Sequence, residues 1–149
     1  MSDARGPRVH VVAGIIQDAA GRVLIAQRPH GKPHAGFWEF PGGKQQPGES
    51  EPQSLARELR EELGIEVHIA DLQPQMRLQH DYVERSVELA VWRVGRYAGE
   101  VHAAEGQVLR WVEPAALKQL PLLPADGPIV DSLLKACPHS PECGQALSQ

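Results

Sequence analysis

Three glutamates near the middle of the chain have a spacing that suits metal chemistry. Glu58, Glu61 and Glu62 stand at positions i, i+3 and i+4, so a helix would place their carboxylates on one face. A solvated acidic face, balanced by Arg57 and Arg60, is the simplest interpretation of such a helix. Like charges at this spacing repel, however, and a hard divalent cation would remove the repulsion. Mg²⁺ commonly joins carboxylates to substrate phosphates, so the cluster favours an enzyme acting on polyphosphates.

A glycine-rich turn precedes the glutamates and could bring the backbone close to the same ion. The segment Pro41-Gly42-Gly43-Lys44 follows the aromatic stretch 37–40. Glycines have no Cβ, so their carbonyls and amides can approach a metal or a phosphate closely. A plain tight turn explains the glycine pair equally well. The turn therefore supports a metal site only in combination with the glutamates.

The glutamates are expected to lie on a well-defined helix over residues 51–63. Ser50 and Gln53 match a capping box at its start, and Gly64 supplies the stop signal at its end. Apolar residues recur at every fourth position, which predicts that one helix face packs on a sheet: Leu55, Leu59 and Leu63.

The rest of the chain predicts short strands and two further helices in one α/β domain. Residues 18–21 are typical of a hairpin turn, and residues 28–36 are too polar for a core element. Strands are expected at 9–17, 22–27, 76–82, 85–94 and 107–112, and helices at 114–120 and 128–136.

The composition limits the classes of partner. With 149 residues, 42% hydrophobic composition and a formal net charge of −4, the chain fits one globular domain. The charges form no basic block, so no nucleic-acid polymer is expected as a partner. The apolar stretch 9–16 is too short to span a membrane and lacks signal-peptide features. We therefore expect a cytoplasmic protein without a membrane partner.

The C-terminal residues are expected to lie outside the folded domain. The domain is predicted to span 1–136, followed by a flexible tail over 137–149. Cys137, His139 and Cys143 lie in this tail, but they are too few for a zinc site, and the cytoplasm disfavours a disulfide.

The central segment resembles the Nudix box. That pattern is Gly, five residues, Glu, seven residues, then Arg-Glu-apolar-x-Glu-Glu-x-Gly-apolar. A chance match at one window is on the order of 10⁻¹⁰, given ordinary residue usage. Every defined position is present here: Gly43, Glu49, Arg57, Glu58, Leu59, Glu61, Glu62, Gly64 and Ile65.

The resemblance, which is greatest to the MutT-like branch, implies an α/β/α sandwich with a mixed β-sheet and a hydrolase dependent on Mg²⁺, with Mn²⁺ as the alternative ion. The family's reaction is attack of a metal-activated water on a diphosphate linkage, which releases a nucleoside monophosphate and pyrophosphate. The implied metal ligands are the Gly42 carbonyl, Glu61, Glu62 and Glu105. Glu58 is implied to be either a further ligand or the general base. Arg57 is implied to orient the carboxylates.

The same resemblance implies a set of substrate-binding residues. Arg28 falls where the branch places a phosphate-binding Arg, and a surface charge is the alternative; Lys44 is a further candidate. Tyr82 and Arg85 match residues near the base. Asp126 either contacts the base edge or caps the helix 128–136. An ionised Asp126 could only accept hydrogen bonds, as from a cytosine amine, whereas a protonated one could also donate.

One departure and several alternatives remain open. Gln46 stands where many members of the family have Glu, which puts an accessory metal in doubt. The expected substrates are oxidised nucleotides such as 8-oxo-dGTP, or cytidine triphosphates, hydrolysed by a monomer or a homodimer that sanitises the nucleotide pool for DNA repair. The alternatives are hydrolysis of another diphosphate, such as ADP-ribose, a dinucleoside polyphosphate or an RNA cap, and a non-catalytic nucleotide-binding module.

Overall fold

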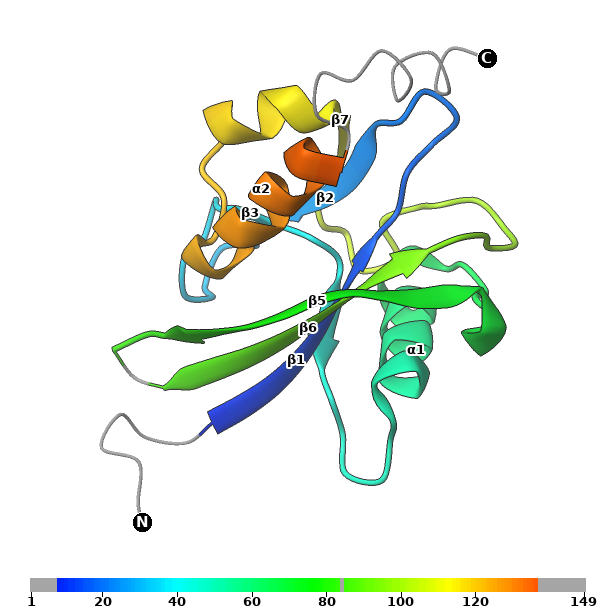
Figure 1. Cartoon of the computed structure of the whole chain (residues 1–149), viewed down its shortest axis with the longest axis horizontal. Helices are drawn as coiled ribbons and strands as arrows, with labels where there is room; N and C mark the ends of the chain where they lie inside the picture. The colour runs from blue at the N-terminus through cyan, green and yellow to red at the C-terminus, as the bar shows by residue number, and fades with distance from the viewer. Residues whose placement is uncertain (1–7, 84, 137–149) are drawn as a thin grey trace.

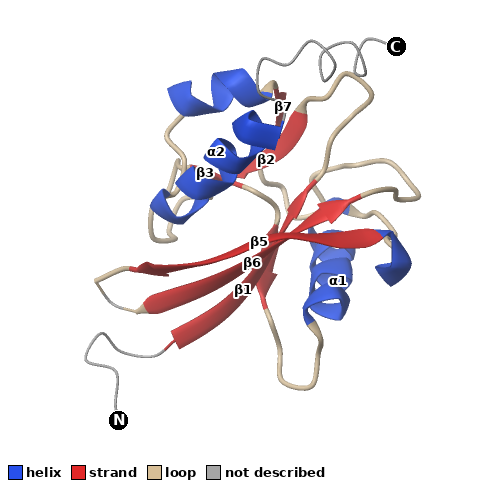
Figure 2. Cartoon of the chain, viewed as in Figure 1, coloured by secondary structure: helices blue, strands red, loops and turns tan. Residues whose placement is uncertain are grey.

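The computed structural model describes residues 8–83 and 85–136, which form seven strands, two α-helices and three short 3₁₀ helices (Figure 2). The strands are β1 (Arg8–Ile15), β2 (Val23–Gln27), β3 (Trp38–Glu39), β4 (Gly42–Lys44), β5 (Leu72–Asp81), β6 (Ser86–Val94) and β7 (Leu109–Val112). The helices are α1 (Glu51–Leu63), α2 (Gly127–Ala136), η1 (Ile69–Asp71), η2 (Pro114–Gln119) and η3 (Pro124–Asp126). The predicted tail, with Cys137 and Cys143, lies outside the described residues.

Two sheets lie between α1 on one side and α2 on the other (Figure 1). The four-stranded sheet has the order β4-β1-β6-β5 and is mixed, because β1 runs parallel to β6 and antiparallel to β4. The three-stranded sheet has the order β3-β2-β7 and is antiparallel. The expected α/β/α sandwich is confirmed. Of the helices within the described residues, none is long and apolar enough to cross a membrane.

Alternation along the central strands builds a separate core on each face of the sandwich. Successive strand residues point to opposite faces. On β1, Val12 packs with α1, whereas Ala13 and Ile15 pack in the cluster that contains Ile129 of α2. The same alternation on β6 sends Ala90 toward α1 and Val91 toward α2. Both helices are thereby fixed against the same strands.

The structure corrects two details of the sequence-based prediction. The turn at Asp18 is present, but β1 and β2 pair only at their ends, through Gln17 and Val23, and then separate into different sheets. Each strand finds longer partners elsewhere, which a local turn signal cannot indicate. The helix expected at 114–120 is the 3₁₀ helix η2, which has no side-chain cap.

The prediction for α1 is confirmed at both ends. Ser50 and Gln53 form the reciprocal capping box, and Gly64 adopts a left-handed conformation with φ 71°. Leu55, Leu59 and Leu63 are completely buried in the core beneath the helix. The helix is thereby held in a fixed position, with Glu58 and Glu62 partly buried beside the leucine face and Glu61 exposed on the outer side.

We expect Leu59→Ala to lower the free energy of unfolding by about 2–4 kcal/mol, because a fully buried Leu leaves a cavity when it is truncated. Thermal and denaturant unfolding measure the effect. Arg60→Ala on the adjacent exposed position is the control and should change the unfolding free energy little. Equal stability of the two variants would show that the helix faces are assigned wrongly.

Candidate active site

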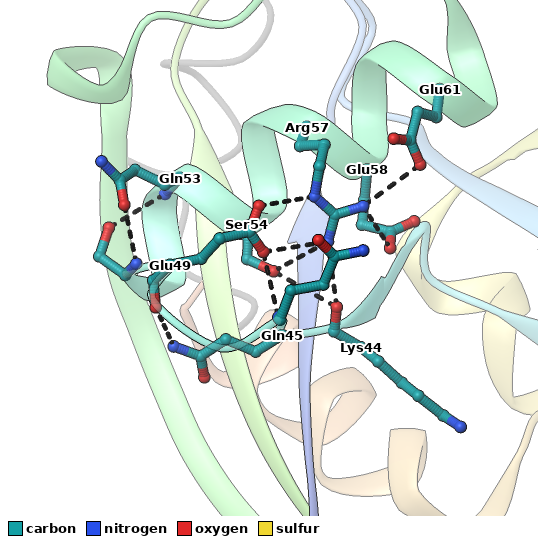
Figure 3. Close-up of polar contacts among 10 residues, drawn as sticks. Lys44, Gln45, Glu49, Gln53, Ser54, Arg57, Glu58 and Glu61 are labelled. Carbon is teal, nitrogen blue, oxygen red and sulfur yellow. Dashed lines mark hydrogen bonds and ion pairs between the residues drawn. The ribbon is translucent and has the colours of Figure 1, made fainter.

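Arg57 is the centre of a polar cluster on the outer side of α1 (Figure 3). Its guanidinium contacts Glu58 at 3.1 Å and Glu61 at 3.2 Å. It also donates to the Lys44 carbonyl at 3.2 Å, which links the helix to β4. The structure therefore places Arg57 where it can orient two of the three helix glutamates.

The strongest partner of Arg57 is Glu49, which sequence reasoning identified only as a position of the box. Glu49 accepts two bonds from the guanidinium, at 2.6 and 3.1 Å. This bidentate pairing lowers the pKa of Glu49 to about 2. Glu49 also orders the loop before the helix, because its carboxylate accepts a hydrogen bond from the main-chain N–H of Gln46 at 3.1 Å. Gln46 itself is exposed, and its described bonds are made by its main chain.

The remaining helix glutamate, Glu62, lies in a crowded acidic environment. Burial raises its pKa well above the ordinary carboxyl range, and a hydrogen bond with Glu58 together with the charges of Glu58, Glu105 and Glu39 raises it further. Glu61 differs, since its side chain is 50% exposed and turned toward Arg57. Glu58 on α1 and Glu105 in the loop before β7 are thus both close enough for their charges to act on Glu62.

The glycine turn is shaped to receive one of these carboxylates. A Cβ on Gly43 would lie 2.4 Å from the carboxyl carbon of Glu58, so only glycine lets this group approach β4. A Cβ on Gly42 would lie 1.9 Å from the Val12 carbonyl, which shows how closely β4 packs on β1. The glycines therefore serve close packing between the strands and the helix.

The donor chemistry of the cluster fits a hard divalent cation. All its members offer oxygen, and the carboxylates repel one another where they are partly buried. Within residues 8–83 and 85–136, no three His, Cys, Asp or Glu side chains already converge tightly enough to hold an ion. Glu58 and Glu61 are drawn to Arg57 instead, so they would have to turn toward the ion. Glu58, Glu61, Glu62, Glu105 and the Gly42 carbonyl would hold it.

Glu39 connects the acidic cluster to a second group of residues, and sequence reasoning missed it. It lies on β3, and burial raises its pKa while the Arg28 guanidinium, 3.1 Å away, opposes that shift. Its charge acts on both Glu62 and Asp126. A charged residue between Trp38 and Phe40, next to the glycine turn, was the signal that could have found it.

Asp126 is buried beside β3, with 4% of its surface exposed. The Phe40 amide donates to its carboxyl group, and burial followed by the nearby Glu39 charge raises its pKa to about 8. In the described part of the chain, Oδ2 of Asp126 is the buried side-chain polar atom without a hydrogen-bond partner. The side chain faces β3 rather than the first amides of α2, so the described contacts do not support the capping alternative.

Tyr82 lies next to Asp126, as the resemblance implied. Its hydroxyl accepts a bond from the Ala125 amide at 3.3 Å, and its ring contacts His34 and His80 at centroid distances of 5.5 and 4.5 Å. Arg85 is close in space, because its carbonyl accepts from the Tyr82 amide at 2.8 Å. The Tyr82 hydroxyl therefore lies beside the segment that carries Asp126; burial raises the pKa of Tyr82, and the charge of Asp126 raises it further.

The two candidate phosphate-binding residues lie in different surroundings. Arg28 is bound to Glu39 and to the Pro33 carbonyl at 2.8 Å, so it is held beside Asp126 and is not a free surface charge. Lys44 is exposed, and its side chain extends away from the Arg57 cluster (Figure 3). The structure thus groups Arg28 with Tyr82 and Asp126. Lys44 joins the Arg57 cluster through its carbonyl, which accepts from Arg57.

Comparison with known proteins bears on this arrangement. A family model described as the NUDIX domain matches residues 11–132. The chain belongs to the Nudix family. This Nudix domain is 42% identical over 126 residues to the CTP pyrophosphohydrolase of Escherichia coli strain K12, covering 85% of this chain and 91% of the relative. It is 37% identical over 126 residues to the 8-oxo-dGTP diphosphatase of Haemophilus influenzae, again covering 85% and 91%.

The fold of the Nudix domain is similar to that of a solved MutT, from a comparison of the Aliivibrio salmonicida and Vibrio cholerae proteins. The TM-score is 0.75 at 36% identity, with 87% of this chain and 98% of that chain covered. The family match over residues 11–132 includes both groups of candidate residues. This chain is therefore a Nudix hydrolase with the complete box.

Proposed function

We propose that this Nudix hydrolase is a Mg²⁺-dependent pyrophosphohydrolase that converts a nucleoside triphosphate and water to the monophosphate and pyrophosphate. The observation that carries the proposal is the arrangement of the acidic residues: Glu58 lies against Gly43 and Arg57, and its charge and that of Glu105 act on the partly buried Glu62 carboxyl. Such an arrangement is unfavourable by itself and becomes favourable with a bound cation. The names of the two curated relatives support the same class of reaction.

The protein residues divide the work between charge and orientation. A bound Mg²⁺ or Mn²⁺ neutralises phosphate charge and makes water more acidic. Glu58, which contacts both Arg57 and Glu62, is the residue we propose to receive the proton from the attacking water, or to serve as a ligand. Arg57 keeps Glu58 and Glu61 beside the cluster, so each carboxylate would have only a short rotation to make toward a bound ion, which limits the entropic cost of assembling the site. The bond that breaks joins the first two phosphates, and pyrophosphate leaves.

The base is proposed to be read by Asp126. With a pKa of about 8, this carboxyl is mostly protonated at neutral pH, so it offers one donor and one acceptor. Cytosine presents an acceptor, N3, beside its amine, and a guanine-type base presents O6 beside N1–H. A neutral carboxylic acid matches either pair, whereas a carboxylate matches neither fully. We therefore propose cytidine triphosphates and 8-oxo-dGTP as the substrates, drawn from the cytoplasmic nucleotide pool.

The experiment that tests the proposed function is a panel of about twenty nucleoside di- and triphosphates, compared by kcat/KM with Mg²⁺ present. We expect CTP, dCTP or 8-oxo-dGTP to rank first, and ADP-ribose and dinucleoside polyphosphates to rank far below. A panel led by ADP-ribose or by a dinucleoside polyphosphate would contradict the proposal.

A pH prediction follows from the state of Asp126. As the pH rises through about 8, Asp126 loses its proton and its donor, so kcat/KM for CTP should fall relative to that of Asp126→Asn, whose amide keeps both donor and acceptor. At neutral pH the Asn variant should match the wild type, and Asp126→Leu should lose about 1–3 kcal/mol of transition-state binding. A parallel pH profile for wild type and Asn variant would remove Asp126 from the base site.

Folding stability should follow the same titration. The pKa of Asp126 is raised above its unfolded value, so its contribution to stability is complete below the unfolded pKa and is lost as the pH rises through about 8. Between the unfolded pKa of 3.8 and the folded pKa of about 8, the free energy of unfolding should therefore decline by up to about 1.4 kcal/mol per pH unit. Asp126→Asn should remove that part of the decline, as measured by denaturant unfolding of both proteins at matched pH values.

A further inference from the structure

The loop that carries Glu105 is attached to the C-terminal end of α1. The last carbonyls of a helix have no partner inside the helix and need donors from elsewhere. Here the His102 amide donates to Leu63 O at 3.0 Å, and the Ala104 amide donates to Glu62 O at 3.0 Å. Both acceptors lie next to or within the acidic cluster, so the path of the loop is fixed relative to Glu62.

One side chain completes this attachment. Nε2 of Gln107 donates to the same Glu62 carbonyl at 2.9 Å, while its Oε1 accepts from the Glu105 amide at 3.0 Å. The two ends of a single half-buried amide therefore connect the main chains of Glu62 and Glu105, and the charge of Glu105 acts on the Glu62 carboxyl. A Glu at this position would lose the donor, and a Met of similar length would lose both bonds.

The attachment opposes a force that the site itself creates. The negative charge of Glu105 disfavours the ionised form of Glu62, so two carboxylates that are to share one cation would repel each other until that cation is bound. Glu105 is exposed on a turn that ends at Gly106, where φ is 76°. Without the Gln107 bridge, the Glu105 amide loses its hydrogen bond, and the turn is held by the main-chain bonds of its neighbours, from Ala104 N to Glu62 O and from Gly106 N to Ala103 O.

We propose that Gln107 is a positioning residue that holds Glu105 against Glu62 so that both carboxylates can serve one divalent cation. The proposal rests on the proposed function, in which Glu105 is a metal ligand. Gln107 acts through the main chain of its neighbours and does not itself contact the substrate. Groups that orient metal ligands in this way commonly change metal affinity or activity by about 10- to 100-fold when they are removed.

The test compares Gln107→Met with Gln119→Met, an exposed glutamine on η2 that serves as the matched control. Mn²⁺ binding is titrated by electron paramagnetic resonance without nucleotide, and amide hydrogen exchange is followed at Glu105. For Gln107→Met we expect about tenfold weaker Mn²⁺ binding, at least about tenfold lower kcat at nearly unchanged KM, and faster exchange at Glu105. Gln119→Met should resemble the wild type, and both variants should remain folded by circular dichroism.

Two more variants, Glu105→Gln and the double variant Glu105→Gln/Gln107→Met, distinguish a failure of the Gln107 proposal from a failure of the proposed function. If Gln107 acts through Glu105, the double variant should bind Mn²⁺ no more weakly than Glu105→Gln alone. Wild-type Mn²⁺ affinity and kcat in Gln107→Met, with both reduced in Glu105→Gln, would overturn the role of Gln107 and leave the function intact. Unchanged Mn²⁺ affinity and kcat in Glu105→Gln would overturn the role of Glu105 and, with it, that of Gln107.

Discussion

Glu62→Gln is expected to lower kcat at least about 100-fold while the protein remains folded. Glu62 is the carboxyl on which the charges of Glu58, Glu105 and Glu39 all act, so its own charge would contribute directly to holding the cation. The amide keeps the size of the side chain and an acceptor oxygen but loses the charge. Steady-state kinetics at saturating Mg²⁺ measure the effect, and a residual kcat above about a tenth of the wild-type value would show that Glu62 is not a ligand.

Stability provides the internal control for this variant. The raised pKa of Glu62 means that its contribution to folding is present below the unfolded pKa and is lost as the pH rises. Gln cannot ionise, so the Glu62→Gln protein does not lose this stability as the pH rises. Without metal and near neutral pH, it should melt at the same temperature as the wild type or higher. Glu61→Gln should lower kcat similarly, but without the gain in stability, because Glu61 is half exposed. A variant that lost both activity and stability would indicate misfolding.

Arg57→Lys is expected to lower kcat by about 10- to 100-fold even though the positive charge is kept. The guanidinium binds Glu49 through two nitrogens and reaches Glu58 and Glu61 with a third, a geometry that an ammonium group cannot reproduce. Released from Arg57, the two helix carboxylates lose their orientation. KM should change less than kcat, because the effect concerns groups that act in the transition state.

Arg57→Met extends the comparison to the charge itself. We expect a loss of stability in addition to the loss of kcat, because Glu49 and Glu58 would both lose the guanidinium that they share. Arg60→Met, at an exposed position one turn further along α1, is the control. Full activity of Arg57→Lys would contradict the account, since charge alone would then suffice.

The local features of the site could be predicted from sequence because they are encoded within one segment. The ends of α1, its buried leucines and the position of its glutamates all depend on residues between Ser50 and Gly64, and all are confirmed. The family resemblance added Tyr82 and Asp126, which the structure places side by side. Their roles in binding remain proposals.

The features that sequence reasoning missed depend on contacts between distant segments. Glu39 gains its importance from Arg28 and Asp126, which come from a loop and from η3. The division into two sheets depends on which strands find longer partners, and β5 begins early despite Pro74, because an edge strand tolerates proline. Gln107 is an ordinary polar residue in the sequence, and only its two bonds in the fold distinguish it.

The measurement that tests the central claim most directly is identification of the products formed from CTP or 8-oxo-dGTP, with Mg²⁺ and with the metal removed by chelation. The account predicts nucleoside monophosphate and pyrophosphate in equal amounts with Mg²⁺, no turnover after chelation, and at most about a hundredth of the wild-type turnover in Glu62→Gln. Release of nucleoside diphosphate and inorganic phosphate, or turnover that persists after chelation, would contradict it.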